Sequence, residues 1–128
     1  MPIRLNTFSY RFGEQVLNGR LSVKKEIENV LTDKSIELGD MSRPALNAKI
    51  RDLFIDKGWQ DQPAVFDDPD DPSAKMDFLK DRVGVEVCFG HPSFIGIDLL
   101  KFQVSSYSAL DSIDVGVYVV TTKIFKSK

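Results

Sequence analysis

Two acidic residues, Asp77 and Glu86, stand nine positions apart in a segment that alternates apolar and polar residues. The alternation predicts a β-hairpin over residues 74–90, with Asp81 and Arg82 as a two-residue turn. In that register Asp77 lies directly opposite Glu86, on one face of the hairpin. Paired carboxylates repel unless a cation lies between them, and Mg²⁺ favours one or two carboxylates with waters and substrate phosphates. A metal held by this pair can polarise a phosphodiester and lower the pKa of an attacking water.

The same register places Lys75 opposite Cys88 on the face of the two acids. A lysine there would stabilise the charge that develops on phosphorus, or would orient the attacking water. The other face is expected to be the core, and this core fixes the register. It collects Met76, Phe78, Val83, Val85 and Val87.

Two helices are expected before the hairpin. The first covers residues 21–33, with Ser22 as its N-cap and an apolar face at helical spacing formed by Val23, Ile27, Val30 and Leu31. The second begins after the cap Ser42 and ends at Gly58. Its apolar stripe is Leu46, Ile50, Leu53 and Phe54.

The remaining elements are a short strand at 64–66, a third helix at about 93–107 and a last, β-branched strand at 112–122. A nearly continuous apolar strand after a helix is typical of a buried strand reached by a crossover. The predicted fold class is α/β: a single domain, 1–128, with a mixed four-stranded sheet flanked by helices. The order is helix, helix, three strands, helix, strand.

Composition narrows the function classes. The chain has 128 residues and a formal net charge of −2, so it lacks the basic balance typical of nucleic-acid binders, although local patches would suffice. With His91 as the single histidine and Cys88 as the single cysteine, a zinc site of histidines and cysteines is not expected. No secretory signal is recognised, and the lone cysteine favours a cytoplasmic location.

Asp77, the nine-residue step to Glu86, and Cys88 two positions later resemble the Asp…Glu-x-Lys signature of the PD-(D/E)XK nuclease superfamily. The predicted order of elements matches the core of that superfamily. Within it, KDRVGVEVCFG followed by DLLKFQ is most similar to the BglII-type restriction endonucleases. The resemblance implies a restriction-endonuclease-like fold and a metal-dependent DNA endonuclease.

The resemblance also implies roles for individual residues. Asp77 and Glu86 would hold Mg²⁺, or Mn²⁺, and many members add a glutamate from the first helix, for which Glu26 is the candidate. The third signature position usually carries lysine, or glutamine or glutamate in the BglII-type branch. This chain has Cys88 there, and a thiol is a poor Mg²⁺ ligand. Either Lys75 has taken over the cationic role, or activity is weak or lost.

On the third helix, Gln103 and Tyr107 resemble a Gln-x-x-x-Tyr motif of some exonucleases in the superfamily, and Lys101 is expected to contact phosphate. The expected partner is double-stranded DNA. Cutting both strands of a palindrome requires two active sites related by a two-fold axis, so a homodimer is also expected.

Three functions remain open at this stage. The intact Asp77 and Glu86 favour an active endonuclease of restriction type. Cys88 and the acidic composition favour a weak or inactive relative that serves as a nucleic-acid-binding or assembly subunit. A small partner-binding domain without nucleic acid is the third, since two acids on a solvated sheet face would also produce this pattern.

Overall fold

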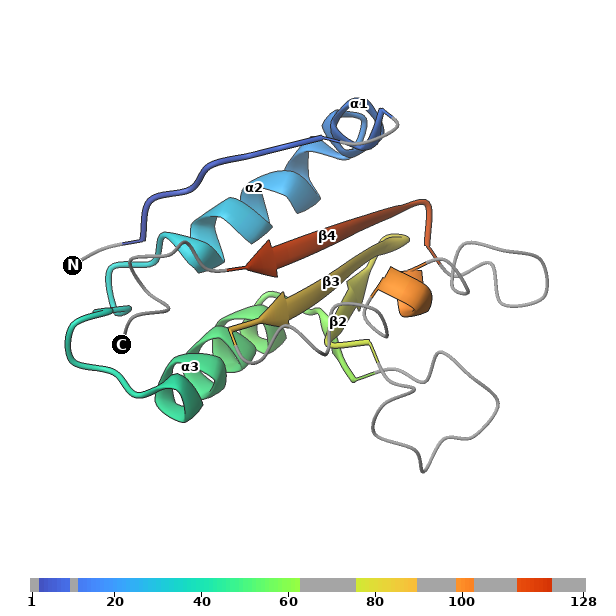
Figure 1. Cartoon of the computed structure of the whole chain (residues 1–128). Helices are drawn as coiled ribbons and strands as arrows, with labels where there is room; N and C mark the ends of the chain where they lie inside the picture. The colour runs from blue at the N-terminus through green and yellow to red at the C-terminus, as the bar shows by residue number, and fades with distance from the viewer. Residues whose placement is uncertain (1–2, 10–11, 63–75, 90–98, 103–112, 121–128) are drawn as a thin grey trace. The chain divides into compact units, whose positions relative to one another are not determined.

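The computed structural model describes residues 3–9, 12–62, 76–89, 99–102 and 113–120 (Figure 1). The chain divides into two compact units, an N-terminal unit, Met1–Trp59, and a C-terminal unit, Gln60–Lys128. The N-terminal unit is helical and the C-terminal unit carries a mixed four-stranded sheet, which confirms the predicted α/β class. No helix in the described part of the chain is long and apolar enough to cross a membrane.

Helix α2, Leu21–Leu31, is the first helix that the sequence predicts. All four residues of its expected apolar face are buried: Val23, Ile27, Val30 and Leu31. The predicted cap is wrong, however. Arg20 holds the N-cap position without a side-chain bond, and its carbonyl accepts the N–H of Lys24 at 3.0 Å, so Ser22 already lies inside the first turn.

Helix α3, Arg43–Asp56, begins as predicted. The hydroxyl of Ser42 accepts the N–H of Ala45 at 3.2 Å, which satisfies one of the first N–H groups of the helix. After the helix, Gly58 takes a φ of 87°, a left-handed conformation that glycine adopts without steric cost. Leu46, Ile50 and Phe54 are buried, and α3 packs against α2.

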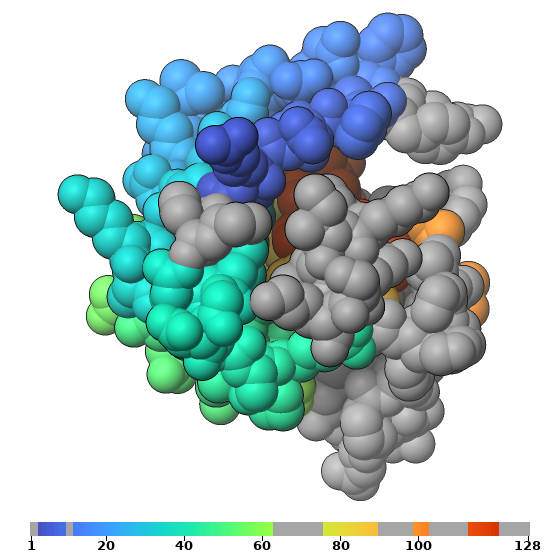
Figure 2. All heavy atoms as spheres, turned by 60° about the vertical axis from the view of Figure 1, so that its left-hand side comes forward, coloured from blue at the N-terminus to red at the C-terminus, as the bar shows by residue number. Residues whose placement is uncertain are grey.

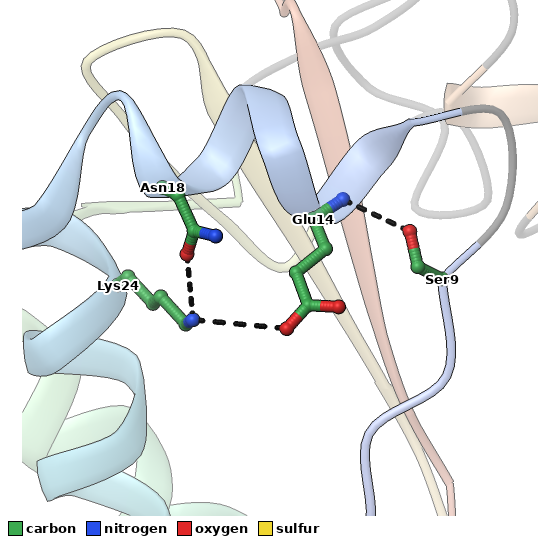
Figure 3. Close-up of polar contacts among 4 residues, drawn as sticks. All are labelled: Ser9, Glu14, Asn18 and Lys24. Atoms are coloured by element: carbon green, nitrogen blue, oxygen red, sulfur yellow. Dashed lines mark hydrogen bonds and ion pairs between the residues drawn. The ribbon is translucent and has the colours of Figure 1, made fainter.

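A short helix, α1 (Gly13–Asn18), was not predicted, because it buries no residue and so has no apolar face to recognise. Its N-cap, Phe12, makes no side-chain bond, and the hydroxyl of Ser9 instead accepts the N–H of Glu14 at 3.0 Å. Lys24 of α2 donates to Asn18 at 2.7 Å and lies 3.9 Å from the carboxylate of Glu14 (Figure 3). These contacts join α1 to α2, and the segment 3–9 lies alongside α2 in both Figure 1 and Figure 2.

The sheet of the C-terminal unit has the order β1-β2-β3-β4. Its strands are β1 (Gln60–Asp61), β2 (Phe78–Lys80), β3 (Val83–Cys88) and β4 (Val115–Val120). The first three are antiparallel neighbours, and β4 runs parallel to β3, as the predicted crossover requires (Figure 1). The strand expected at 64–66 lies outside the described residues; β1 is the strand that pairs with β2.

The two faces of the sheet differ in the size of their side chains. Phe78, Val83 and Val85 form the expected apolar face and are buried. On the other face, Gly84 of β3 and Gly116 of β4 lie side by side in the parallel register. These two glycines lower the surface of that face, and larger side chains fill the space above them.

Met76 lies on the glycine face, which corrects the prediction that it joins Phe78 in the core. A Cβ added to Gly84 would overlap the sulfur of Met76, so the two residues are in direct contact. Met76 clusters with Ile113, and Leu79 and Phe102 pack against them. The alternation fails because the chain bends at Asp77, one residue before β2 begins.

Candidate active site

The hairpin has the register that the sequence predicts. Lys80 pairs with Val83 and Phe78 pairs with Val85, so the next pair in the same register is Asp77 with Glu86. The turn residues Asp81 and Arg82 have φ angles of 49° and 64°. Positive φ at both central residues is the type I′ geometry, whose twist matches that of the flanking strands. Neither residue is glycine, so the turn carries a conformational cost of about 1–2 kcal/mol per residue.

Contacts to Asp114 hold this strained turn in place. Arg82 donates from Nε to the Asp114 carboxylate at 3.0 Å, and its Nη2 lies 2.9 Å from the same oxygen. The backbone N–H of Asp114 donates to the carbonyl of Arg82 at 2.7 Å. The turn is therefore tied to the residue just before β4, which fixes the end of the hairpin relative to the parallel strand.

Asp77 is held by its main chain and its side chain. Its carbonyl accepts the N–H of Gln62 at 2.9 Å, and its Oδ2 accepts the N–H of Val87 at 2.7 Å. The carboxylate thus accepts the N–H of Val87, which would donate to a backbone carbonyl of β2 if that strand extended further toward the N-terminus. Because the nitrogen of Val87 is bonded to the carbonyl carbon of Glu86, Asp77 Oδ2 lies within about 5 Å of the Glu86 Cα. The two predicted metal ligands are neighbours.

Glu86 is buried, which its position on the outer face of a hairpin did not predict. Its Oε1 lies 2.9 Å from Nζ of Lys101, and the two side chains are 3% and 7% exposed. Lys101 belongs to the helical segment 99–102. Two residues that the sequence assigned to different tasks, metal binding and phosphate contact, therefore form one buried ion pair.

Phe102 and the glycine face position this ion pair. A Cβ at Gly116 would lie 2.5 Å from Cδ1 of Phe102, so the ring rests directly on the strand. The ring also makes an edge contact with Tyr118, at 6.2 Å between centroids, and Tyr118 is the β4 partner of Glu86. The residue that follows Lys101 is thus anchored beside Glu86.

The helical segment 99–102 buries a different face from the one its apolar residues indicate. Leu99 and Leu100 are 51% and 48% exposed, whereas Lys101 is buried. An apolar-periodicity argument assigns charged residues to solvent, so it missed Lys101 as a partner of Glu86. The recognisable signal was the pair of glycines at aligned positions in the last two strands, which leave room for a helix to approach.

Cys88 lies two positions beyond Glu86 on β3, and alternate residues of a strand share a face. It is half-buried and is the sole cysteine of the chain. Its β4 partner is Val120, which is 55% exposed. The third signature position is thus near the carboxylates but carries a thiol.

Glu26 lies on α2 in the N-terminal unit. Its Oε1 accepts the indole N–H of Trp59 at 2.9 Å, and Trp59 in turn packs edge-on against Phe54. This bond orients a partly buried carboxylate that the resemblance proposes as a metal ligand. Lys75, Gln103 and Tyr107 lie outside the described residues, as does His91.

The chemistry of the donor set fits a hard divalent cation. Asp77 supplies carboxylate oxygens from the residue just before β2, and Glu86 supplies them from β3. The ammonium of Lys101 at Glu86 marks a place where positive charge is stabilised. Among the described residues, no group of three or more acidic, histidine or cysteine side chains is arranged to hold a metal. Two carboxylates are nevertheless sufficient where water and substrate phosphate complete the coordination of Mg²⁺.

Comparison with known families agrees with the mixed α/β fold. The family model described as restriction endonuclease BglII/BglIII matches residues 5–128, which is nearly the whole chain. No curated protein matches significantly. Restriction endonucleases of this kind act on DNA and generally use divalent metal ions. The chain therefore belongs to the BglII/BglIII restriction endonuclease family, within the PD-(D/E)XK-like nuclease superfamily.

Proposed function

We propose that the protein is a metal-dependent DNA endonuclease that hydrolyses phosphodiester bonds, as type II restriction enzymes do. The observation that carries this proposal is the placement of Asp77, whose carboxylate is fixed at the backbone N–H of Val87, directly beside Glu86. A carboxylate held by a backbone bond on one strand, next to a buried glutamate on the neighbouring strand, is preorganised for a cation.

Asp77 and Glu86 would hold the metal, together with a backbone carbonyl of residue 87 or 88, and we propose Mg²⁺, with Mn²⁺ as a substitute. When bound, the ion would lower the pKa of a coordinated water and offset negative charge on the phosphate. We propose Glu26 as a further carboxylate ligand from α2.

The residues of the chain have distinct tasks in this proposal. Asp77 and Glu86 fix the position of the reacting phosphate, and Cys88 lines the site without supplying charge. Lys75 is proposed as a cation for the developing charge. Gln103 and Tyr107 are proposed as DNA contacts.

We propose double-stranded DNA as the substrate and a homodimer as the working form, because cleavage of both strands of a palindrome requires two sites. We also propose that the protein acts in the cytoplasm, a location with which its single cysteine agrees. Light scattering over a micromolar concentration series tests the dimer. A mass of one protomer at every concentration would count against it.

Cleavage of mixed plasmid and genomic DNA by purified protein tests the activity. Incubation with MgCl₂ or MnCl₂ is expected to convert supercoiled plasmid to linear products, and EDTA is expected to stop the reaction. Absence of EDTA-sensitive cleavage with either metal, at any protein concentration, would contradict the proposal.

One observation favours a second function. Cys88 occupies the signature position where the family usually has lysine, glutamine or glutamate. If no other residue supplies the charge or hydrogen bond that a lysine, glutamine or glutamate provides at that position, the protein would bind DNA, or assemble with other subunits, without cutting. Metal-independent binding of duplex DNA, measured by fluorescence anisotropy in the absence of any cleavage, would support this alternative.

A further inference from the structure

The buried pair of Glu86 and Lys101 is costly to maintain. Removing two charges from water carries a desolvation penalty that their attraction often only offsets, so such a pair is weak evidence of a stability role. The helical segment 99–102 also exposes Leu99 and Leu100 to solvent and buries the charged residue Lys101. An arrangement that buries the lysine in preference to the two leucines is expected where the ammonium has a task in the site.

The location of the ammonium defines that task. Nζ of Lys101 lies 2.9 Å from the carboxylate of Glu86, on the strand face that also carries Cys88. Lysine at position 88 would reach the same region from two residues along β3. Lys101 therefore supplies, from the helical segment 99–102, the positive charge that Cys88 on β3 does not supply.

We propose that Lys101 is a catalytic cation of this site and takes the place of the residue at position 88. This inference rests on the proposed nuclease function and names a residue for it. Lys101 keeps its ion pair with Glu86 while its ammonium donates an N–H to a non-bridging oxygen of the phosphate bound beside it. As the water oxygen bonds to phosphorus, the water releases a proton to solvent. The P–O ester bond that breaks leaves its electron pair on the departing oxygen, which takes up a proton from solvent and becomes a hydroxyl. Lys101 stays protonated throughout.

Neighbouring residues keep Lys101 in position. Phe102 rests on Gly116 and contacts Tyr118 edge-on, and Tyr118 is paired across the parallel strands with Glu86. This packing fixes the backbone from which the lysine extends. A preorganised charge of this kind is more effective than a mobile surface lysine, because it does not need to reorganise during the reaction.

The test compares parent protein with Lys101→Gln, Lys101→Arg and the double variant Cys88→Lys/Lys101→Gln. Lys25→Gln is the matched control, because it removes the same charge from an exposed position on α2. Single-turnover cleavage is measured at saturating metal, and duplex binding is measured separately with Ca²⁺. Circular dichroism at the assay temperature establishes that each variant is folded.

Lys101→Gln is expected to slow cleavage by about 100-fold or more, as removal of one preorganised donor to a developing charge does, while duplex affinity changes little. Lys101→Arg should be intermediate, the double variant should recover most of the loss, and Lys25→Gln should match the parent. A folded Lys101→Gln that cleaves within about threefold of the parent would overturn the inference. Loss of binding in proportion to loss of rate would also overturn it, since that assigns Lys101 to DNA affinity alone.

A measurement on the parent protein covers the case in which the neutral variants do not fold. The ¹⁵Nζ resonance of Lys101 is followed as duplex oligonucleotide is added with Ca²⁺. A shift of that resonance supports contact with phosphate, and an unchanged resonance at saturation overturns the inference. If the parent protein never cleaves DNA, the proposed nuclease function itself is wrong. If the parent cleaves DNA and the Lys101→Gln variant cleaves equally well, only the role of Lys101 is wrong.

Discussion

The carboxylate of Asp77 accepts the backbone N–H of Val87 at 2.7 Å, across the hairpin that the two residues share. The side chain thus completes the hydrogen bonding of β3 where β2 has already bent away. Asp77 therefore has a structural bond in addition to its proposed metal-binding role, and substitutions can separate the two.

Asp77→Asn is expected to fold with nearly parental stability, because the amide oxygen still accepts the N–H of Val87. Asp77→Ala leaves that partly buried N–H without its acceptor and should lower the free energy of unfolding by about 1–2 kcal/mol. Both should abolish cleavage, since neither supplies a carboxylate. Urea denaturation and the plasmid assay measure the two effects. Equal stability of the two variants would show that the Val87 bond contributes nothing.

The ion pair of Glu86 and Lys101 predicts a strongly non-additive double-mutant cycle. Glu86→Met removes the carboxylate that faces the buried ammonium, and Lys101→Met removes the ammonium that faces the buried carboxylate, so each should cost about 3 kcal/mol. The double variant, in which apolar side chains of similar size replace both charges, should be close to the parent in stability. Additive losses, measured by chemical denaturation, would contradict a direct pair.

Gly116→Ala is expected to be more harmful than Gly84→Ala. At Gly116 the new Cβ would lie 2.5–2.9 Å from three atoms of the Phe102 ring, and relief requires the ring and its helical segment to shift. At Gly84 the closest atoms belong to the flexible side chain of Met76, which adapts at lower cost. Gly116→Ala should destabilise by about 1–3 kcal/mol. It should also slow cleavage through displacement of Lys101, whereas equal effects of the two substitutions would refute this packing.

Asp33 gives a prediction about pH. The Ser35 side chain and then the Ser35 backbone N–H, which lies 2.8 Å from Oδ1, lower the pKa of the Asp33 carboxyl below its ordinary 3.8. The resulting stabilisation is present above the unfolded-state pKa and is lost as the pH falls through the lowered folded-state pKa. Ser35→Ala should move the Asp33 pKa upward, measured by NMR titration of the carboxyl carbon. An unchanged midpoint would exclude the hydroxyl as a cause.

The hairpin register was predictable because alternating residues and a two-residue turn leave one arrangement that buries the valines. The consequences of the bend at Asp77 were not predictable. Local alternation assigns Met76 to the wrong face, since nothing in the pattern shows that β2 begins at Phe78. The sequence pattern also indicates two carboxylates, Asp77 and Glu86, that repel each other, and it omits one partner of each. Asp77 accepts the backbone N–H of Val87, and Glu86 pairs with the ammonium of Lys101. Sequence periodicity encodes neither contact.

Family membership and the geometry of Asp77 and Glu86 together make metal-dependent DNA cleavage the central claim. The most direct measurement is linearisation of supercoiled plasmid in Mg²⁺ by the parent and by Asp77→Asn, which preserves the Val87 bond while removing the charge. The account predicts EDTA-sensitive cleavage by the parent and none by folded Asp77→Asn at equal concentration. Equal cleavage by both proteins, or none by the parent in Mg²⁺ or Mn²⁺, would contradict it.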